Sequence, residues 1–137
     1  MDNFEKNIVM LVDDSNIDSY INQKMIQNFG FAEKIYVHHS SEKALEFFKN
    51  FERLPDLPLS LLPTFIFLDI SMPDIDGFDF LEELKKINER ITKKLKVVFV
   101  TSSTRTEDIK RAKEFKNVIK FFSKPLTSEN LKQLESE

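Results

Sequence analysis

The chain has 137 residues, the length of one domain that buries roughly two-thirds of the surface its unfolded chain exposes. Its formal net charge is −3 with both signs interspersed, so neither nucleic acid nor an anionic membrane surface is expected as its main partner. Without cysteine it has neither a disulfide framework nor a thiolate metal site.

Short apolar runs alternate with amphipathic stretches along the chain, a pattern typical of an α/β fold. We predict a strand at 7–12 that stops on Asp13 and Asp14, followed by a helix at 16–29 that ends at Gly30. Apolar side chains recur along that helix at the spacing of one helical face: Ile17, Tyr20, Ile21, Met25 and Phe29.

The next predicted elements are a strand at 34–38, which is the least hydrophobic and hence an edge strand, and a helix at 41–52. The helix is expected to bury Ala44, Leu45, Phe47, Phe48 and Phe51. Residues 53–63 hold three of the five prolines, whose spacing forbids a continuing helix. We interpret this segment as an extended loop whose leucines cover one end of the core, and a partner-docking loop is the alternative.

A third strand is predicted at 64–69, and it stops on Asp69. The chain then turns through Pro73 into a helix that begins near Gly77. The inward side chains of this helix are expected to be Phe78, Leu81, Leu84 and Ile87.

The C-terminal part repeats the alternation, with a strand at 96–101, a helix at 105–115, a strand at 118–122 and a helix at 127–135. Asn117 precedes the last strand, in a turn where it tolerates a left-handed backbone. Five β-α units in succession predict a doubly wound parallel sheet with right-handed crossovers.

Polar side chains collect where four of these strands end. Asp13 and Asp14 follow the first strand, Asp69 the third, Thr101 ends the fourth, and Lys124 follows the fifth. In doubly wound sheets the functional crevice lies off the carboxyl ends of the strands. Carboxylates about 4 Å apart repel by about 4 kcal/mol at an effective dielectric of 20, and a divalent cation would reverse that effect.

This set of side chains suits phosphoryl transfer to a carboxylate. An ionised Asp is the nucleophile, Mg²⁺ offsets charge, Lys adds a mobile cation and Thr a hydrogen-bond donor. Each residue alone has an ordinary structural explanation, as a turn former, a helix cap, a strand residue or a solvated lysine. Their joint placement and order favour the functional interpretation.

Four segments resemble the motifs of receiver domains of two-component response regulators, of the single-domain CheY-like type. They are Val12-Asp13-Asp14-Ser15, Phe67-Leu68-Asp69-Ile70-Ser71-Met72-Pro73-Asp74-Ile75-Asp76-Gly77, Phe99-Val100-Thr101-Ser102 and Phe122-Ser123-Lys124-Pro125. The resemblance covers essentially all of residues 1–137, and it implies one receiver domain without an output domain. It also implies a flavodoxin-like (βα)5 fold with strand order 2-1-3-4-5.

The resemblance implies that Asp69 accepts a phosphoryl group from a phosphohistidine on a histidine kinase or a histidine phosphotransfer protein. Mg²⁺ would be held by Asp14, by Asp69 and by the backbone carbonyl of Ser71, with Asp13 acting through bound water. The phosphoryl oxygens would contact Thr101 and Lys124.

The same resemblance makes Phe121 a switch residue that couples to Thr101, and it implies a cis peptide bond between Lys124 and Pro125. The expected output is contact with a downstream protein through the face formed by the helix at 105–115, the last strand and the last helix, or onward phosphotransfer. The chain departs from the family pattern at the long segment 53–63 and at Lys116-Asn117, where many members have Gly. Small hydroxyls at Ser71 and Ser103 leave the lifetime of the phosphoryl group open.

Three other functions remain as alternatives. A Mg²⁺-dependent phosphohydrolase with an Asp nucleophile would want a second acid at position 71, which is Ser. A flavodoxin-like FMN carrier would need a phosphate loop where Asp13 and Asp14 stand. A receiver that signals without phosphorylation would not need the combination of acidic residues, Thr101 and Lys124. A metal site at His38 and His39 is given little weight, because the sequence has no third histidine to complete it.

The location in the cell follows from what the sequence lacks. The N-terminus has no basic stretch followed by an apolar one, so it is not a signal peptide. No apolar run nears the roughly 18 residues of a membrane span. We therefore expect a cytoplasmic protein that does not insert into a membrane.

Overall fold

The structure is a computed structural model that describes residues 7–135, so the N-terminal stretch interpreted above lies mostly outside the described residues. Five parallel strands form one sheet in the order β2-β1-β3-β4-β5, as predicted. The strands are β1 (Ile8–Val12), β2 (Lys34–His38), β3 (Phe65–Leu68), β4 (Lys96–Thr101) and β5 (Val118–Ser123). The strand at 34–38 lies at an edge, as its composition indicated.

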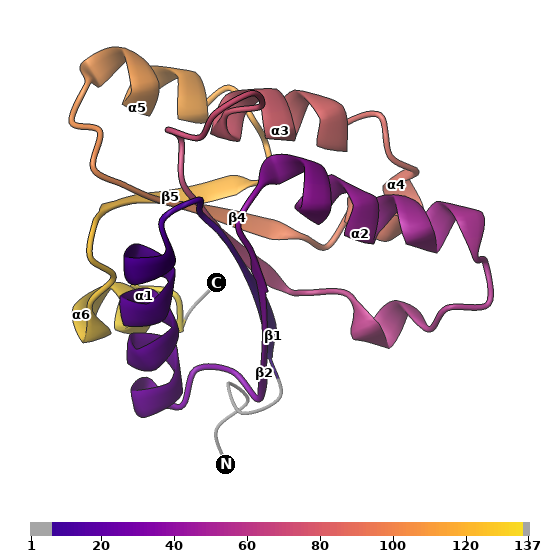
Figure 1. Cartoon of the computed structure of the whole chain (residues 1–137), viewed down its shortest axis with the longest axis horizontal. Helices are drawn as coiled ribbons and strands as arrows, with labels where there is room; N and C mark the ends of the chain where they lie inside the picture. The colour runs from indigo at the N-terminus through magenta and orange to yellow at the C-terminus, as the bar shows by residue number, and fades with distance from the viewer. Residues whose placement is uncertain (1–6, 136–137) are drawn as a thin grey trace.

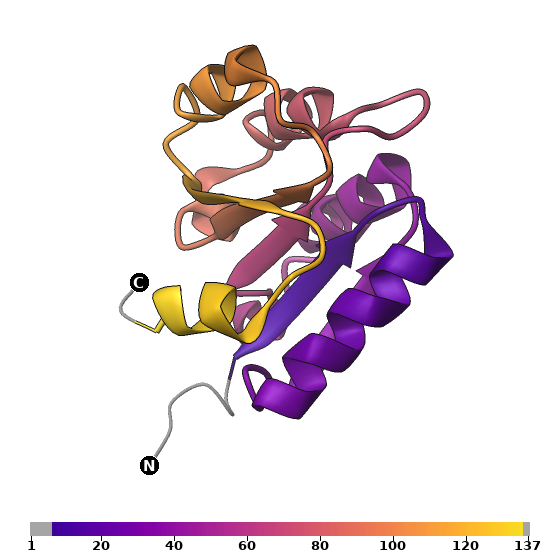
Figure 2. The same ribbon diagram turned by 90° about the vertical axis from the view of Figure 1, so that its left-hand side faces the viewer.

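Helices cover both faces of the sheet (Figures 1 and 2). One face carries α2 (Ser41–Arg53), α3 (Gly77–Leu84), the short α4 (Glu89–Thr92) and α5 (Thr106–Ala112). The other face carries α1 (Asn16–Phe29) and α6 (Ser128–Gln133). None of the helices in residues 7–135 is long and apolar enough to cross a membrane.

The central strands β1, β3 and β4 are almost entirely apolar because both of their sides are covered. Successive side chains of a strand point to opposite faces, so Met10 and Val12 join one core cluster while Val9 and Leu11 join the other. The central strands therefore read as continuous apolar runs, which is why their positions were predicted well from the sequence.

Local hydrogen bonds explain where several helices begin and end. The hydroxyl of Ser15 accepts from the backbone N–H of Asp18 at the start of α1, and Gly30 ends that helix with φ 77°. Asp76 and Asp79 form a reciprocal capping box at the start of α3. These signals agree with the predicted boundaries.

The buried face of α1 does not follow the apolar residues that recur along the helix. Ile17, Tyr20 and Ile21 are exposed at 73%, 61% and 44%, and the helix instead buries Ser19, Asn22 and Ile26. Both buried polar side chains have hydrogen-bond partners. Asn22 accepts from the N–H of Leu126 at 3.0 Å, far along the chain, and Ser19 donates to the carbonyl of Asp13 at 3.4 Å, just before the helix. Apolar spacing alone does not reveal such long-range bonds. The last two predicted residues, Met25 and Phe29, do pack against the core.

The proline-rich segment after α2 is only partly the covering loop that was predicted. It contains a 3-10 turn, η2 (Leu59–Leu61), and Tyr36 donates a hydrogen bond to the carbonyl of Leu61 at 2.9 Å. Two of its leucines, Leu57 and Leu62, pack against the core. The other three, Leu54, Leu59 and Leu61, are exposed.

Several details of the C-terminal half also differ from the prediction. Helix α3 ends at Leu84, so Ile87 is buried from the turn that leads into α4, a helix that was not predicted. Helices α5 and α6 are shorter than the predicted ranges.

The predicted left-handed backbone at Asn117 is wrong, because Asp74 is the one non-glycine residue with positive φ in residues 7–135. The side chain of Asn117 acts instead: its amide donates to the carbonyls of Thr92 and Leu95 at 3.2 and 2.9 Å. These bonds tie the turn before β5 to the turn before β4. The predicted cis peptide bond between Lys124 and Pro125 is confirmed.

Candidate functional site

The carboxyl ends of β1, β3, β4 and β5 meet at one edge of the sheet, and backbone hydrogen bonds continue just beyond the strands there. The N–H of Asp13 donates to the carbonyl of His38 at 3.1 Å, and the N–H of Asp69 donates to Val12 at 3.0 Å. The N–H of Lys124 donates to the carbonyl of Thr101 at 3.0 Å. The residues after the strands therefore leave the sheet at fixed positions.

Three carboxylates gather at this edge. Asp13, Asp14 and Asp69 each offer an oxygen, and these oxygens all lie within 4.8 Å of one another. Asp13 and Asp69 are both only 5% exposed, whereas Asp14 is exposed to solvent. An all-oxygen set with one open side fits Mg²⁺, which keeps several waters and takes one or two carboxylates.

The carboxylate of Asp69 is oriented by two contacts. One oxygen, Oδ1, accepts a hydrogen bond from the N–H of Ile70 at 2.8 Å. The other, Oδ2, lies 3.2 Å from the Nζ of Lys124. With one oxygen fixed by the backbone, the second points at the lysine.

Glycine at position 77 lets α3 begin against the site. A Cβ on Gly77 would lie 2.4 Å from the carbonyl oxygen of Asp69 and 3.0 Å from the Cα of Ile70. The N–H of Gly77 also donates to the carbonyl of Ile70 at 2.9 Å. Any larger residue would push α3 away from the strand end that carries Asp69.

The ammonium of Lys124 sits among three carboxylates. Its Nζ lies 2.8 Å from Asp13, 2.9 Å from Asp18 and 3.2 Å from Asp69, and its side chain is only 13% exposed. Asp18 belongs to the first turn of α1 and was not predicted as a site residue. An acid in the first turn of a helix is ordinarily explained by the helix dipole, so the sequence offered no specific signal for this contact.

Burial and charge oppose one another in this cluster. Burial raises the pKa of Asp13, although a hydrogen bond from Lys124 and one from the N–H of Ser15 partly offset that effect. The hydrogen bond from Lys124 lowers the pKa of Asp18. Burial alone would lower the pKa of Lys124, but hydrogen bonds to Asp13 and Asp18 and the charge of Asp69 raise it well above its usual range. The lysine is thus held in its charged form.

Thr101 is fully buried at the end of β4, and its hydroxyl oxygen accepts from the N–H of Ser103 at 3.3 Å. Ser103 in turn donates to the carboxylate of Asp108 at 2.6 Å. A hollow of about 730 Å³ lies beside these residues, and its lining includes Ile70, Ser71, Met72, Ser102 and Ser103. The hollow thus lies next to the residues that follow Asp69 and Thr101 in the chain.

Residues 9–134 match the family model of the response regulator receiver domain. The chain belongs to this family. The curated relative "Probable methanogenesis regulatory protein FilR2" of Methanothrix harundinacea agrees with that assignment. It is 30% identical over 130 residues, which are 95% of this chain and 79% of the relative.

Solved receiver structures share the fold. A two-component response regulator from Cytophaga hutchinsonii has a TM-score of 0.82 at 26% identity, covering 94% of this chain and 93% of its own. The receiver domain of the histidine kinase CKI1 from Arabidopsis thaliana, complexed with Mg²⁺ and BeF₃⁻, has a TM-score of 0.77 at 19% identity, covering 98% and 93%. Membership in a family of signalling switches disfavours the phosphohydrolase alternative.

This receiver domain brings most of the predicted site residues to one edge, and it keeps others apart. Phe121 is half-buried and packs on the ring of Phe99 at a centroid distance of 5.7 Å. His39 places Nδ1 3.2 Å from the carbonyl of Asp13, while the ring of His38 lies against Phe47. The acidic group found among the described residues consists of Asp13, Asp14 and Asp69 and includes neither histidine.

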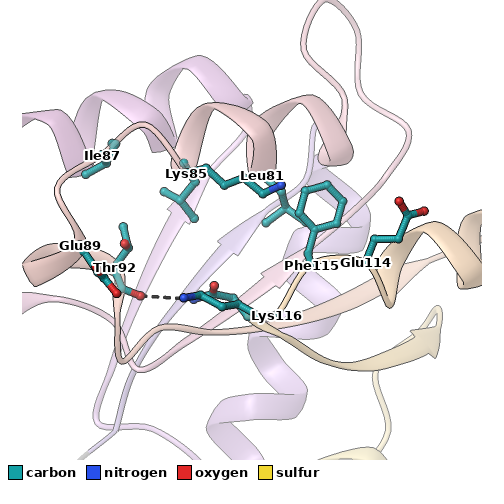
Figure 3. Close-up of a pocket in the computed structure, with 10 residues that line it drawn as sticks. Leu81, Lys85, Ile87, Glu89, Thr92, Glu114, Phe115 and Lys116 are labelled. Atoms are coloured by element: carbon teal, nitrogen blue, oxygen red, sulfur yellow. Dashed lines mark hydrogen bonds between the residues drawn. The ribbon is translucent and has the colours of Figure 1, made fainter.

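A second hollow of this receiver domain lies away from the carboxylates. It measures about 430 Å³ and is formed by α3, α4 and the turn before β5, with Leu81, Ile87 and Phe115 among its walls (Figure 3). Lysines and glutamates both line it, and none of its residues belongs to the site described above. The candidate site is therefore the carboxyl edge of the sheet.

Proposed function

We propose that this receiver domain is a switch in which Asp69 accepts a phosphoryl group from a phosphohistidine of a histidine kinase or a histidine phosphotransfer protein. The observation that carries the proposal is the position of the Asp69 carboxylate. It is buried, oriented by the N–H of Ile70, and shares its edge with two further carboxylates and one ammonium. Family membership supports acceptance on an aspartate.

In the proposed transfer, an oxygen of Asp69 bonds to phosphorus while the bond from phosphorus to the histidine nitrogen breaks. The imidazole leaves with the electron pair. Lys124 lies within hydrogen-bond distance of Asp69 and is positioned to contact an oxygen of the arriving group. The buried hydroxyl of Thr101 is the second proposed contact.

Mg²⁺ would be held by Asp14, by Asp69 and by the carbonyl of Ser71, with Asp13 acting through water. Its chemistry there would be to offset the charge of the carboxylates and the phosphoryl oxygens. The close oxygens of three aspartates support this assignment, because a cation would offset the repulsion that Lys124 offsets only for Asp13 and Asp69 among the described contacts. The solved CKI1 receiver domain carries Mg²⁺ at 19% identity, which is a precedent for the fold.

The proposed output is a change in protein contacts or onward transfer of the phosphoryl group. Phosphorylation adds charge beside Thr101, at the end of β4. Strand β5 adjoins this point, since Thr101 pairs with Ser123, and Phe121 on β5 is the proposed coupling residue. Helices α5 and α6 lie on opposite faces of the sheet, before and after β5 in the chain (Figure 1). We therefore assign the signalling surface to these three elements, and we assign the chain a switching role without enzymatic turnover.

The direct test is incubation with acetyl phosphate and Mg²⁺, followed by the mass of the intact protein. We expect one added phosphoryl group on the wild-type protein, and none on Asp69→Asn or after chelation of Mg²⁺. Asp74→Asn is the matched control, because Asp74 is an exposed residue of the same turn and lies outside the acidic group. A label that persists on Asp69→Asn, or is lost on Asp74→Asn, contradicts the assignment of the acceptor.

A further inference from the structure

Asp18 holds the Lys124 ammonium from a different element than the other two carboxylates. Its Oδ2 lies 2.9 Å from Nζ, closer than Asp69 at 3.2 Å. Asp18 comes from the first turn of α1, whereas Asp13 and Asp69 follow strands. The acidic group whose oxygens lie within 4.8 Å of one another does not include Asp18.

Two hydrogen bonds position the first turn of α1, which carries Asp18. The N–H of Asp18 donates to the cap hydroxyl of Ser15 at 3.1 Å, which orients the first turn of α1. Asn22, one turn further along α1, accepts from the N–H of Leu126 at 3.0 Å. This bond is buried and ties the helix to the segment that carries Lys124. The packing of two elements therefore places the backbone of Asp18 near Lys124, and its partly exposed side chain, 39% accessible, completes the contact.

Three carboxylates share the ammonium of Lys124, which donates hydrogen bonds to Asp18 and Asp69 and forms an ion pair with Asp13. An ammonium has three N–H bonds, and three carboxylates lie within 3.2 Å of Nζ. To bind a phosphoryl oxygen at Asp69, the ammonium must give up or share one of these partners. Asp13 and Asp69 have Mg²⁺ as an alternative partner under the proposed function, but Asp18 does not.

We propose that Asp18 is a positioning residue that restrains the Lys124 ammonium and so weakens the hold of the site on a phosphoryl group. This inference rests on the proposed function of Asp69. Asp18 competes with the phosphoryl oxygens for the same N–H donors. The strength of that competition sets how readily the acyl phosphate forms and how long the lysine keeps hold of it.

The test measures the affinity of BeF₃⁻, a phosphoryl mimic, by calorimetry at saturating Mg²⁺. We expect Asp18→Asn to tighten binding by about threefold to fivefold, the upper part of the range for an exposed ion pair. Asp74→Asn removes the same charge from an exposed residue that has no contact with Lys124, and we expect it to change the affinity by less than about twofold. Equal tightening by both variants would reduce the effect to net charge and overturn the proposal.

A double-mutant cycle separates restraint of the lysine from direct repulsion of the ligand. In the Lys124→Met background, we expect Asp18→Asn to leave the weakened BeF₃⁻ affinity unchanged, because no ammonium remains to be released. The same tightening in both backgrounds would show that Asp18 acts without Lys124. Unchanged or weaker binding by Asp18→Asn alone also overturns the proposal.

A readout on the protein without ligand makes the test independent of phosphorylation. The ¹H–¹⁵N resonance of the Lys124 ammonium should be observable in the wild type, because hydrogen bonds and burial slow its exchange with water. Asp18→Asn should shift or broaden it, and an unchanged resonance counts against the contact. If wild-type protein binds no BeF₃⁻ and takes up no phosphoryl group, the proposed function fails. If it does both while Asp18→Asn behaves as wild type, only the role of Asp18 fails.

Discussion

At the scale of the residue, burial in the site disfavours the charged form of the carboxylates. The ammonium of Lys124 offsets part of that cost by its positive charge. Asp13 shows this most clearly. Burial raises the pKa of its carboxyl group, so the charged form costs folding free energy even though Lys124 lies 2.8 Å away. A fold keeps such a group where it binds something, and Mg²⁺ is the proposed ligand.

We therefore predict that Asp13→Asn stabilises the metal-free protein by about 1 kcal/mol in urea unfolding at pH 7. The folded pKa is above the value of 3.8 for an unperturbed Asp, so the destabilising charge is lost as the pH falls through the raised pKa. The stability difference between wild type and variant should accordingly shrink toward pH 4 and remain at higher pH. A variant that is less stable than wild type at pH 7 would contradict this account.

The order of residues after the strands predicted that Asp13, Asp69 and Lys124 lie close together, and the structure agrees, but this order did not include Asp18. Asp13, Asp69 and Lys124 are recognisable because parallel strands deliver the residues that follow them to one edge. Asp18 reaches Lys124 only through the packing of α1 against the segment after β5, a contact between residues 106 positions apart. No local pattern encodes such a distance.

At the scale of the element, two glycines mark the start of α3 and the end of α1, where other residues would be strained. Gly77 begins α3 directly against the carbonyl of Asp69, while Gly30 ends α1 with φ 77° and no atom within 4 Å of a built Cβ. The two positions need glycine for different reasons. Position 77 has no room for a Cβ atom, and position 30 adopts a left-handed backbone that favours glycine.

We predict that Gly77→Ala costs about 3 kcal/mol of unfolding free energy, because its Cβ would meet backbone atoms that cannot move aside easily. Gly30→Ala should cost only about 1 kcal/mol, the price of a left-handed alanine. Chemical denaturation of both variants measures the difference. Gly77→Ala should also slow phosphorylation by acetyl phosphate, since the clash displaces Asp69. Equal losses of stability in the two variants would remove steric contact as the explanation.

Sequence patterns predicted the strands better than they predicted the faces of helices. The central strands are apolar on both sides, so predicting where they lie did not require knowing which side faces which core. The apolar spacing along α1 does not reveal its buried face, because Ile17 and Tyr20 are exposed while Asn22 is buried. The bond of Asn22 to Leu126 forms only in the folded chain.

At the scale of the whole molecule, four strand ends, α1 and α3 converge on one charged site, so binding there should report on the stability of the entire fold. A ligand that binds only the folded state stabilises it by RT ln(1 + [L]/Kd). For Mg²⁺ at about 100 times its Kd the gain is about 2.7 kcal/mol. Because unfolding of a single domain is cooperative, this gain should raise the midpoint of the whole thermal transition.

Asp14 gives the sharpest test of this coupling, because it is the exposed member of the acidic group. Asp14→Asn should leave the unfolding midpoint of the metal-free protein within about 1 °C of wild type, as expected for an exposed side chain. It should nevertheless abolish most of the shift of several degrees that Mg²⁺ gives the wild type, since an amide is a weaker ligand for a hard cation. Asp74→Asn should keep the full shift. If Asp14→Asn responds to Mg²⁺ as the wild type does, the cation binds elsewhere, and the carboxyl edge of the sheet is not its site.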